Sequence, residues 1–391
     1  MKAPLRNNSA RLLLGPGPSP VHPRVLAALS EPVLGHLDPE FCDIMSETTQ
    51  LLRYVFATEN ALTVPLSGTG SAGMDASLTN LLEPGDKAVV LSCGVFGERL
   101  CDIVPRLGAE LVKVDSKWGT PVDPADVKRA IAQAGRPKVV AAVHAETSTG
   151  VLQPLEEITK YAHEAGALMV VDAVTSLGGT EVPTDRLSLD FVYSGTQKCL
   201  SCPPGLAPVT LSEAAQQAIA RRKSAVSSWY LDLSMIQRYW TGERFYHHTA
   251  PVNMVYALHE ALSLIREETL EHCWARHARN ARAFSEGVTA MGLELLVAPE
   301  YRLPSLVVIK VPQGIDDAQV RQKLLSDYNI EIGGGLGELK GKIWRVGLMG
   351  HGSKQSNIVL LLAALEHILK NLGMDVPEGA GTSAASRAFS N

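Results

Sequence analysis

Cysteine, charge of one sign and long apolar runs are all scarce in this chain of 391 residues. Its six cysteines are too few for a disulfide framework, which favours a reducing compartment. Cys199 and Cys202 form the only C-x-x-C pair and lack a second Cys or His pair at zinc spacing, so we assign no metal site. The net charge of -5 comes from interspersed residues of both signs and leaves no basic stripe for nucleic acid. We therefore expect small molecules as partners.

The longest apolar run, "IVLLLAAL" at residues 358–365, is far shorter than the roughly 18 residues that a membrane helix needs. We expect no contact with a membrane. The first 30 residues contain four basic residues and no acid, which weakly resembles a transit peptide. The expected location is the cytoplasm, with an organellar location left open.

Apolar side chains make up 46% of the chain, enough to bury a large core. Short apolar runs bounded by Gly and Asp alternate with helix-like stretches such as "LEEITKYAHEAG". This alternation predicts an α/β fold with a mostly parallel sheet covered on both faces. The expected strands cover residues 87–93, 138–146, 167–174, 190–196 and 207–212.

After residue 255 the pattern changes to one long helical stretch, followed by three strand-like runs and the helix "SNIVLLLAALEHILKNLG". This order predicts a smaller α+β domain. The Gly/Ala/Ser-rich end reads as a loose or docked tail. The expected division is an N-terminal segment (1–20), a large domain (21–265), a small domain (266–372) and a tail (373–391).

Two charged residues follow neighbouring expected strands. Asp172 ends "ALMVVD", and Lys198 comes after "DFVYSG", 26 residues later. Ligands of open α/β sheets bind at the carboxyl ends of the strands, so both side chains would face one crevice. A lysine there can form a Schiff base with an aldehyde cofactor, and an aspartate can hold a pyridinium nitrogen protonated. The alternatives are a helix-capping or paired Asp172 and a surface Lys198.

Two further segments can hold anions. Residues 67–71, "SGTGS", precede a good helix-forming stretch, where backbone amides and the helix dipole favour a phosphate. An ordinary glycine-rich turn is the alternative. Arg345 lies inside the apolar run "KIWRVGLM", where a guanidinium requires a partner. That partner is either an internal acid or a substrate carboxylate.

Several long segments are ordered as in one family, among them "SGTGSAGMDASLTNLLEPGD", "HAETSTGVLQPL", "VDAVTSLGG", "YSGTQKCLSCPPG" and "YHHTAPV". On these segments the chain resembles the class V branch of fold-type I PLP-dependent aminotransferases, and especially the alanine/serine:glyoxylate (serine:pyruvate) aminotransferases. The resemblance implies a large domain with a seven-stranded type of sheet, a smaller C-terminal domain, bound pyridoxal 5'-phosphate, and a homodimer with shared active sites.

The resemblance assigns roles to individual residues. Lys198 would be the Schiff-base lysine and Asp172 the partner of the pyridinium, while Arg345, Gly17 and Thr147 would contact the substrate. Two positions depart from the pattern, since relatives often have Trp at Phe96 and His at Ser71. The residues implied to bind the cofactor are Thr69, Gly70, Ser71, Phe96, Thr147, Asp172, Val174, Gln197, Lys198 and, from the neighbouring subunit, Tyr246 and Thr249.

The activity implied is ping-pong transfer of the amino group of a small amino acid, alanine or serine, to glyoxylate or pyruvate. Lys198 would act as the general base at the α-carbon. Related enzymes with ureidoglycine, aminoethylphosphonate or kynurenine-type donors remain alternatives, as does a PLP-dependent lyase or desulfurase. A desulfurase needs a mobile thiol in the second domain, and no cysteine follows Cys273. A nucleotide-binding module is disfavoured because the chain lacks a dinucleotide fingerprint.

Overall fold

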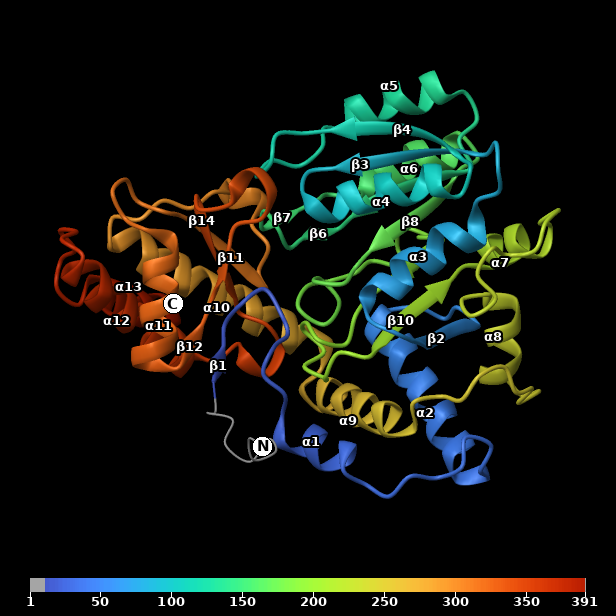
Figure 1. Cartoon of the computed structure of the whole chain (residues 1–391), viewed down its shortest axis with the longest axis horizontal. Helices are drawn as coiled ribbons and strands as arrows, with labels where there is room; N and C mark the ends of the chain where they lie inside the picture. Colours follow the sequence, from blue (N-terminus) through green and yellow to red (C-terminus); the bar gives the residue numbers. More distant parts are fainter. Residues whose placement is uncertain (1–10, 391) are drawn as a thin grey trace, which may run out of the picture.

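The structure is a computed structural model that describes residues 11–390. Figure 1 shows two parts, a larger one built mainly from the first two thirds of the chain and a smaller one built from its last third. The first described residues lie beside the smaller part, where strand β1 (Leu12–Leu13) pairs in parallel with β12 (Ile330–Glu331). A segment near the start of the described chain therefore shares a small sheet with a segment from its last third.

The larger part is organised around a seven-stranded sheet with the order β2-β10-β9-β8-β5-β3-β4. Adjacent strands in this sheet are parallel, except that β10 runs antiparallel to both of its neighbours, β2 and β9. Its central strands are fully buried, as expected for a sheet covered on both faces. The strands are β2 (Leu62–Ser67), β3 (Lys87–Ser92), β4 (Glu110–Asp115), β5 (Val139–Val143), β8 (Leu168–Asp172), β9 (Phe191–Tyr193) and β10 (Leu206–Leu211).

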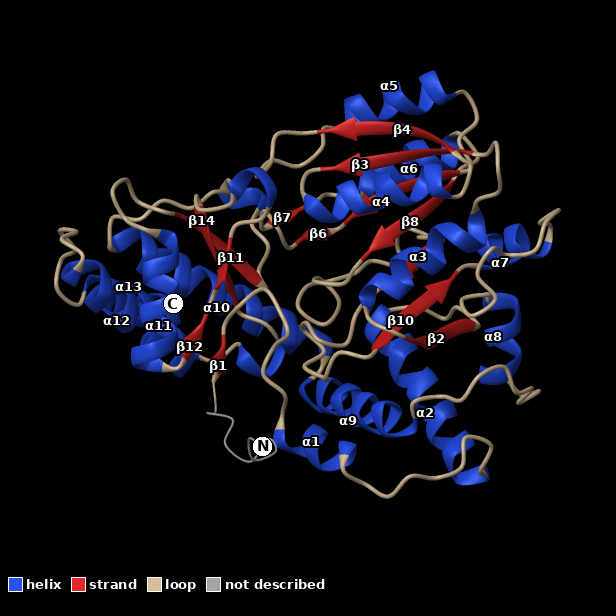
Figure 2. Ribbon diagram, in the orientation of Figure 1, coloured by secondary structure: helices blue, strands red, loops and turns tan. Residues whose placement is uncertain are grey.

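Helices cover this sheet, as Figure 2 shows. A short hairpin, β6 (Ala145–Glu146) with β7 (Val151–Leu152), extends beyond β5. The helices of this part are α1 (Pro23–Leu29), α2 (Pro39–Phe56), α3 (Gly70–Leu81), α4 (Val95–Arg106), α5 (Pro124–Ala134), α6 (Glu156–Glu164), α7 (Glu213–Ala220), α8 (Leu233–Trp240) and α9 (Val252–Glu268).

The smaller part contains an antiparallel sheet with the order β11-β14-β13. Its elements are α10 (Leu270–Ala290), β11 (Leu306–Lys310), α11 (Asp317–Tyr328), β12, β13 (Gly333–Gly334), β14 (Ile343–Gly347), α12 (Gln355–Asn371) and α13 (Ala380–Ser390). Short 3-10 turns lie at Pro299–Tyr301, Gly337–Leu339 and Gly350–Gly352. The C-terminal segment, predicted to be a loose or docked tail, forms α13 and packs against α10.

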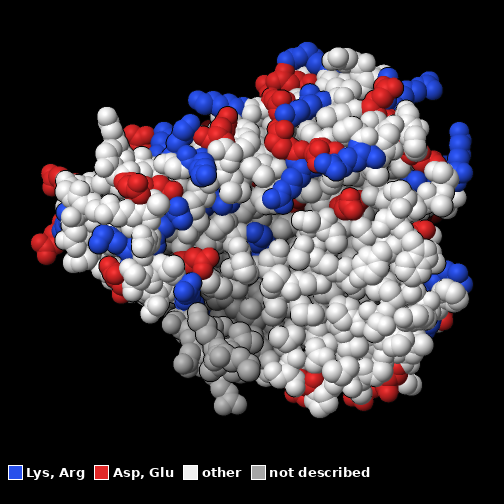
Figure 3. Space-filling view, in the orientation of Figure 1, with Lys and Arg blue, Asp and Glu red and all other residues white. Residues whose placement is uncertain are grey.

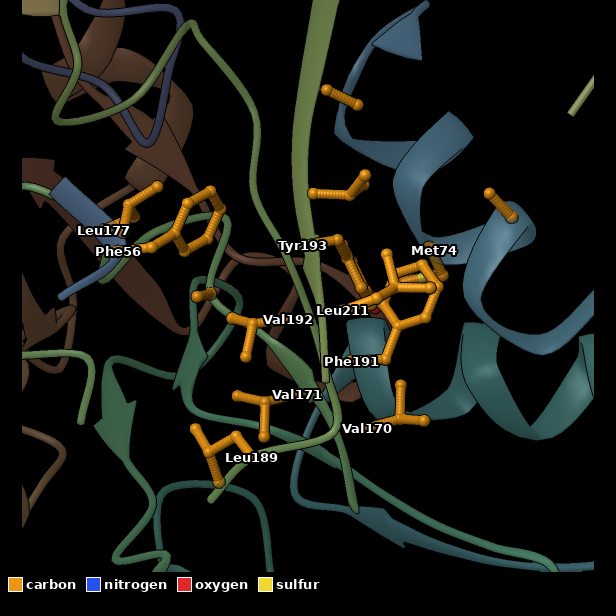
Figure 4. Packing of buried hydrophobic residues seen from close by; sticks show 14 of the residues in the cluster. Phe56, Met74, Val170, Val171, Leu177, Leu189, Phe191, Val192, Tyr193 and Leu211 are labelled. Atoms are coloured by element: carbon orange, nitrogen blue, oxygen red, sulfur yellow. The ribbon is translucent and has the colours of Figure 1, made fainter. Parts of the chain in front are cut away.

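Separate hydrophobic cores support the two parts. The larger core includes Phe191, Val192 and Leu211, and Figure 4 shows such side chains around the central strands. A second core contains Trp344 of β14 and also Leu14, which follows β1. Residues 11–390 include no helix with the length and apolar character needed to cross a bilayer.

Candidate active site

Lys198 and Asp172 lie at the same edge of the large sheet. Asp172 is the last residue of β8 and pairs in register with Tyr193, the last residue of β9. The chain then turns, and Lys198 follows five residues later. Because parallel strands end together, the two side chains enter one buried region, where Asp172 is 2% and Lys198 9% exposed.

The Asp172 carboxylate has only neutral donors around it. Its Oδ1 accepts a hydrogen bond from the Val174 amide at 2.8 Å, and its Oδ2 accepts one from the Tyr193 hydroxyl at 2.9 Å. It forms no salt bridge with any of residues 11–390. Burial raises the pKa of Asp172 from 3.8 to about 7, against the lowering effect of these two bonds. The site thus contains a carboxylate whose charge is not neutralised by a paired cation.

The Lys198 amine faces the segment that follows β1. Its Nζ donates a hydrogen bond to the carbonyl of Pro16. A methyl group at Gly17 would lie 2.6 Å from that Nζ, and the φ of +108° at this position favours glycine. Ser19 holds the lysine backbone, since its hydroxyl donates to the Lys198 carbonyl at 2.6 Å. Burial, together with the nearby charge of Arg345, lowers the pKa of Lys198 from 10.5 to about 8.

The amino-terminal end of α3 meets these loops. A Cβ on Gly70 would lie 2.9 Å from Val174 Cγ2 and 3.5 Å from Gly195 Cα, so α3 begins beside both strand ends. Thr69 precedes the helix without capping it through its side chain, and Ser71 belongs to the first turn. The buried Oε1 atom of Gln197 has no hydrogen-bond partner within the described part of the chain. Free amides, hydroxyls and this amide group suit a phosphate.

Arg345, on β14, reaches the site from the smaller part. Its Nε donates to the Gly334 carbonyl at 2.8 Å and its Nη1 to the Thr147 carbonyl at 3.2 Å. It is 6% exposed and forms no salt bridge within residues 11–390, although the charge of the buried Glu146 acts on it. Burial lowers the pKa of Arg345 to about 10. The hydroxyl of Thr147 bonds that of Thr175, three residues after Asp172.

Phe96 is placed by a residue that sequence reasoning missed. Its amide donates to the buried Glu146 carboxylate at 3.1 Å, and Arg99 lies over its ring at 4.7 Å. Glu146 stands in the "HAETSTG" segment used for the family resemblance. Glu146 is identified by its complete burial at the end of β6, which cannot be read from the sequence.

Tyr246 and Thr249 are not brought to this group. The Tyr246 hydroxyl lies 3.3 Å from the Thr249 hydroxyl, and the Tyr246 ring packs on His36. Neither residue forms a hydrogen bond with Lys198 or Asp172 in the part of the chain that the structure describes. Their expected role at a neighbouring subunit's site stays a prediction.

The assembled residues fit an aldehyde cofactor that carries a phosphate and a basic ring nitrogen. Asp172 forms no salt bridge within residues 11–390, Lys198 is a buried amine of lowered pKa, and α3 begins without a side-chain cap. Arg345 completes the set as a buried cation that forms no salt bridge within residues 11–390. The arrangement can hold an amino acid by its carboxylate beside an amine able to accept a proton.

Comparison with known proteins identifies relatives that are aminotransferases. A family model described as aminotransferase class-V matches residues 12–339. The (S)-ureidoglycine–glyoxylate transaminase of Bacillus subtilis is 39% identical over 399 residues, covering 97% of this chain and 96% of that protein. The alanine–glyoxylate aminotransferase of Mus musculus is 38% identical over 369 residues, covering 92% and 89%.

Two solved structures are also similar. That of the ureidoglycine–glyoxylate aminotransferase from Bacillus subtilis has a TM-score of 0.96 and 40% identity, covering 99% of this chain and all of that one. That of an alanine–glyoxylate aminotransferase from Nostoc sp. has a TM-score of 0.92 and 46% identity, covering 94% and 98%.

Proposed function

The chain belongs to the class-V aminotransferase family, and from this premise we propose that it transfers the amino group of a small amino acid to glyoxylate or pyruvate with pyridoxal 5'-phosphate as cofactor. The family and the fold-type I architecture predicted from the motifs are confirmed. One observation carries the proposal: Lys198, Asp172 and Arg345 converge as buried charged groups, and none of them forms a salt bridge within residues 11–390.

The residues around the crevice would hold the cofactor. Pyridoxal phosphate supplies a carbonyl that condenses with amines and a ring that withdraws electrons from the α-carbon. Asp172 would hold the proton on the ring nitrogen, and Val174 and Phe96 would exclude water from the two ring faces. Thr69, Gly70, Ser71 and Gln197 would bind the phosphate, and Thr147 would lie near the ring hydroxyl.

The chain's own groups would then orient and deprotonate the amino acid. The Arg345 guanidinium presents a planar fork to the α-carboxylate, which fixes the α-carbon. Lys198 Nζ, whose pKa is lowered to about 8, takes the α-proton and later returns it. Gly17, in contact with Lys198, would leave little room beyond a small substrate side chain.

A homodimer with shared sites forms part of the proposal. Figure 3 shows both signs of charge interspersed over one half of the visible face and a broad uncharged area over α1, α2 and α8. Large apolar side chains are exposed on these elements and the loops beside them: Leu26, Val33, Leu37, Trp229, Tyr230, Phe245 and Tyr246. An exposed apolar patch rimmed by charge is typical of an interface, and it includes Tyr246.

Ureidoglycine is the second candidate donor, because a relative named for it aligns over 97% of this chain. The lyase alternative loses support: all six cysteines lie in the described residues, five are buried, and the Cys273 thiol bonds to Glu268. Burial also raises the pKa of Cys273 to about 12, so its thiol is a poor acceptor of sulfur.

A donor and acceptor panel tests the proposal. Purified protein loaded with pyridoxal phosphate is mixed with alanine, serine or ureidoglycine, each with glyoxylate or pyruvate, and amino acid formation is followed. We expect glycine from glyoxylate with at least one donor and no reaction without a 2-oxo acid. Ammonia release that needs no acceptor, or a protein that does not bind the cofactor, would contradict the proposal.

A further inference from the structure

Glu146 is a fully buried carboxylate for which the proposed reaction has no role. Four hydrogen bonds converge on it. Its Oε2 accepts from the amides of Phe96 at 3.1 Å and Gly97 at 3.2 Å. Its Oε1 accepts from the amide and the hydroxyl of Ser148 at 3.0 and 2.6 Å. All four partners are donors, which suits a carboxylate that only accepts, and these bonds oppose the effect of burial, which raises the pKa of Glu146.

Two of these donors belong to the first turn of α4, which lacks a cap of its own. The residue before the helix is Gly94, which has no side chain to offer. The first three amides are bonded instead from the β6 hairpin: Val95 to the Ser148 hydroxyl at 2.9 Å, and Phe96 and Gly97 to Glu146. A Cβ on Gly94 would lie 2.5 Å from the Glu146 carboxyl carbon, which shows how closely the two segments approach.

The same hairpin holds the substrate end of the site. Thr147, between Glu146 and Ser148, accepts the hydrogen bond of Arg345 Nη1 through its carbonyl. Its hydroxyl bonds Thr175, which follows Asp172 by three residues. Moving Glu146 would therefore displace Phe96 on one side and the contact between Thr147 and Arg345 on the other.

We propose that Glu146 is a positioning residue that holds the ring-stacking Phe96 and the carboxylate-binding Arg345 in fixed register. The inference rests on the proposed function, since it assumes a cofactor ring at Phe96 and a substrate acid at Arg345. A simple helix cap would not require this residue, because Ser or Asp caps a helix without burying so large a charged side chain.

The test compares Glu146→Gln with Glu98→Gln. Glutamine keeps the shape, but its amide nitrogen is a donor that must face at least one backbone amide donor, so at least one of the four hydrogen bonds is lost. Glu98 lies on the same helix, has a side chain that is 42% exposed, and bonds Ser92 and Lys113 rather than Phe96 or the β6 hairpin. We expect Glu146→Gln to raise the Kd for pyridoxal phosphate and the KM for the amino donor about tenfold each. It should also weaken the circular dichroism that the bound cofactor acquires.

Glu98→Gln should leave all three quantities unchanged, and Glu146→Asp, which keeps the charge, should recover part of them. If Glu146→Gln lowers only the thermal midpoint of the apo-protein, Glu146 is a structural cap and the inference fails. Should that variant not fold, Ser148→Ala removes one donor and should shift the same quantities by a smaller factor. No shift in that variant overturns the inference. A wild-type protein without cofactor binding or transamination overturns the proposed function instead.

Discussion

At the scale of single residues, the site depends on charges that the folded chain leaves uncompensated. Asp172 is surrounded by neutral donors, and Lys198 and Arg345 repel each other. Burying such groups costs free energy, which is recovered when ligands of complementary charge bind. Under the proposed function, the residues whose burial costs stability are the ones that would bind the ligands.

Asp172→Asn should separate these two effects. Asparagine can keep both hydrogen bonds, because the Tyr193 hydroxyl can accept from the new amide. The raised pKa means that the folded protein retains a proton between pH 4 and 7 that the unfolded chain releases, so this group's contribution to stability falls across that window. Raising the pKa from 3.8 to about 7 corresponds to roughly 4 kcal/mol at pH 8.

The apo variant should therefore be at least as stable as the unsubstituted apo-protein at pH 8, while its stabilisation by the cofactor shrinks and activity falls about 100-fold or more. Thermal unfolding with and without pyridoxal phosphate measures this. Asp190→Asn is the control, since Asp190 is also buried but bonds His163 and Ser212. It should destabilise both forms alike. A less stable apo variant with an unchanged cofactor effect would refute the prediction.

A second prediction concerns how the rate of cofactor uptake at Lys198 depends on pH. The lowered pKa means that the neutral amine, the reactive form, predominates above about pH 8. Cofactor uptake by the apo-protein should accelerate about tenfold per pH unit below this value and level off above it. Arg345→Gln removes a nearby positive charge and should move the plateau to higher pH. Stopped-flow absorbance records the profile, and a plateau near pH 10.5 in the wild-type protein would count against a buried amine.

Part of the site could be predicted from residues and part could not. Strand ends locate Asp172 and Lys198, because an apolar run followed by a charge indicates the ligand edge of a sheet. Glu146 was missed because an acid before "TSTG" looks the same in a solvated turn. Its burial depends on the approach of Gly94, 52 positions away. Thr147 bonds Arg345 and Thr175, and the sequence could not predict these two contacts because they depend on tertiary structure.

At the scale of elements, the segment that follows β1 packs closely against the Lys198 side chain. Gly17 has φ of +108° and no room for a methyl group beside Lys198. Gly17→Ala should therefore lower kcat/KM about 100-fold by displacing the amine. Gly314→Ala is the matched control, because Gly314 has φ of +82° and nothing within 4 Å. Both should lose about 1 kcal/mol of stability from backbone strain, but only the first should lose activity. Equal activities of the two variants in steady-state assays would show that the contact between Gly17 and Lys198 does not position the amine.

The junction between α9 and α10 allows a second prediction. The sequence predicts one long helix from residue 255, whereas the structure breaks it at Thr269, whose φ is +70°. A β-branched residue is strained there, so Thr269→Gly should stabilise the protein by about 1 kcal/mol. Thr289→Gly, in the last turn of α10, should destabilise it by about as much. Urea unfolding of the pair should give opposite signs, and equal signs would refute the strain.

Strands and helices could be predicted where the local amino-acid composition alone determines the secondary structure. Five strands of the large sheet lie where apolar runs place them, but β2 and β4 were missed. Pro65 within β2 argues against a strand. The edge strand β4 is largely exposed and interrupts its apolar residues with Glu110, Lys113 and Asp115. The break at Thr269 carries no Gly or Pro, so the periodicity continues through it. Helix α13 forms from small residues because α10 provides a surface to pack on.

At the scale of the whole molecule, the exposed apolar area should bury itself in a homodimer. Trp229 is 59% exposed, and charging it should split the dimer. Trp229→Glu is expected to elute at the mass of one chain and to lose cofactor affinity, because Tyr246 and Thr249 would no longer reach a neighbouring site. Leu360→Glu, at a residue 46% exposed on α12, should change neither property. Light scattering during size exclusion gives the mass, and a fully active wild-type monomer would contradict the prediction.

The pairing of β1 with β12 also bears on how the protein is made. During synthesis, Leu12 leaves the ribosome more than 300 residues before its strand partner, so the large sheet can form while the first strand still waits. Arg345 emerges later still. The site around Lys198 would therefore stay open on the nascent chain until the segments that carry β12 and Arg345 have been synthesised.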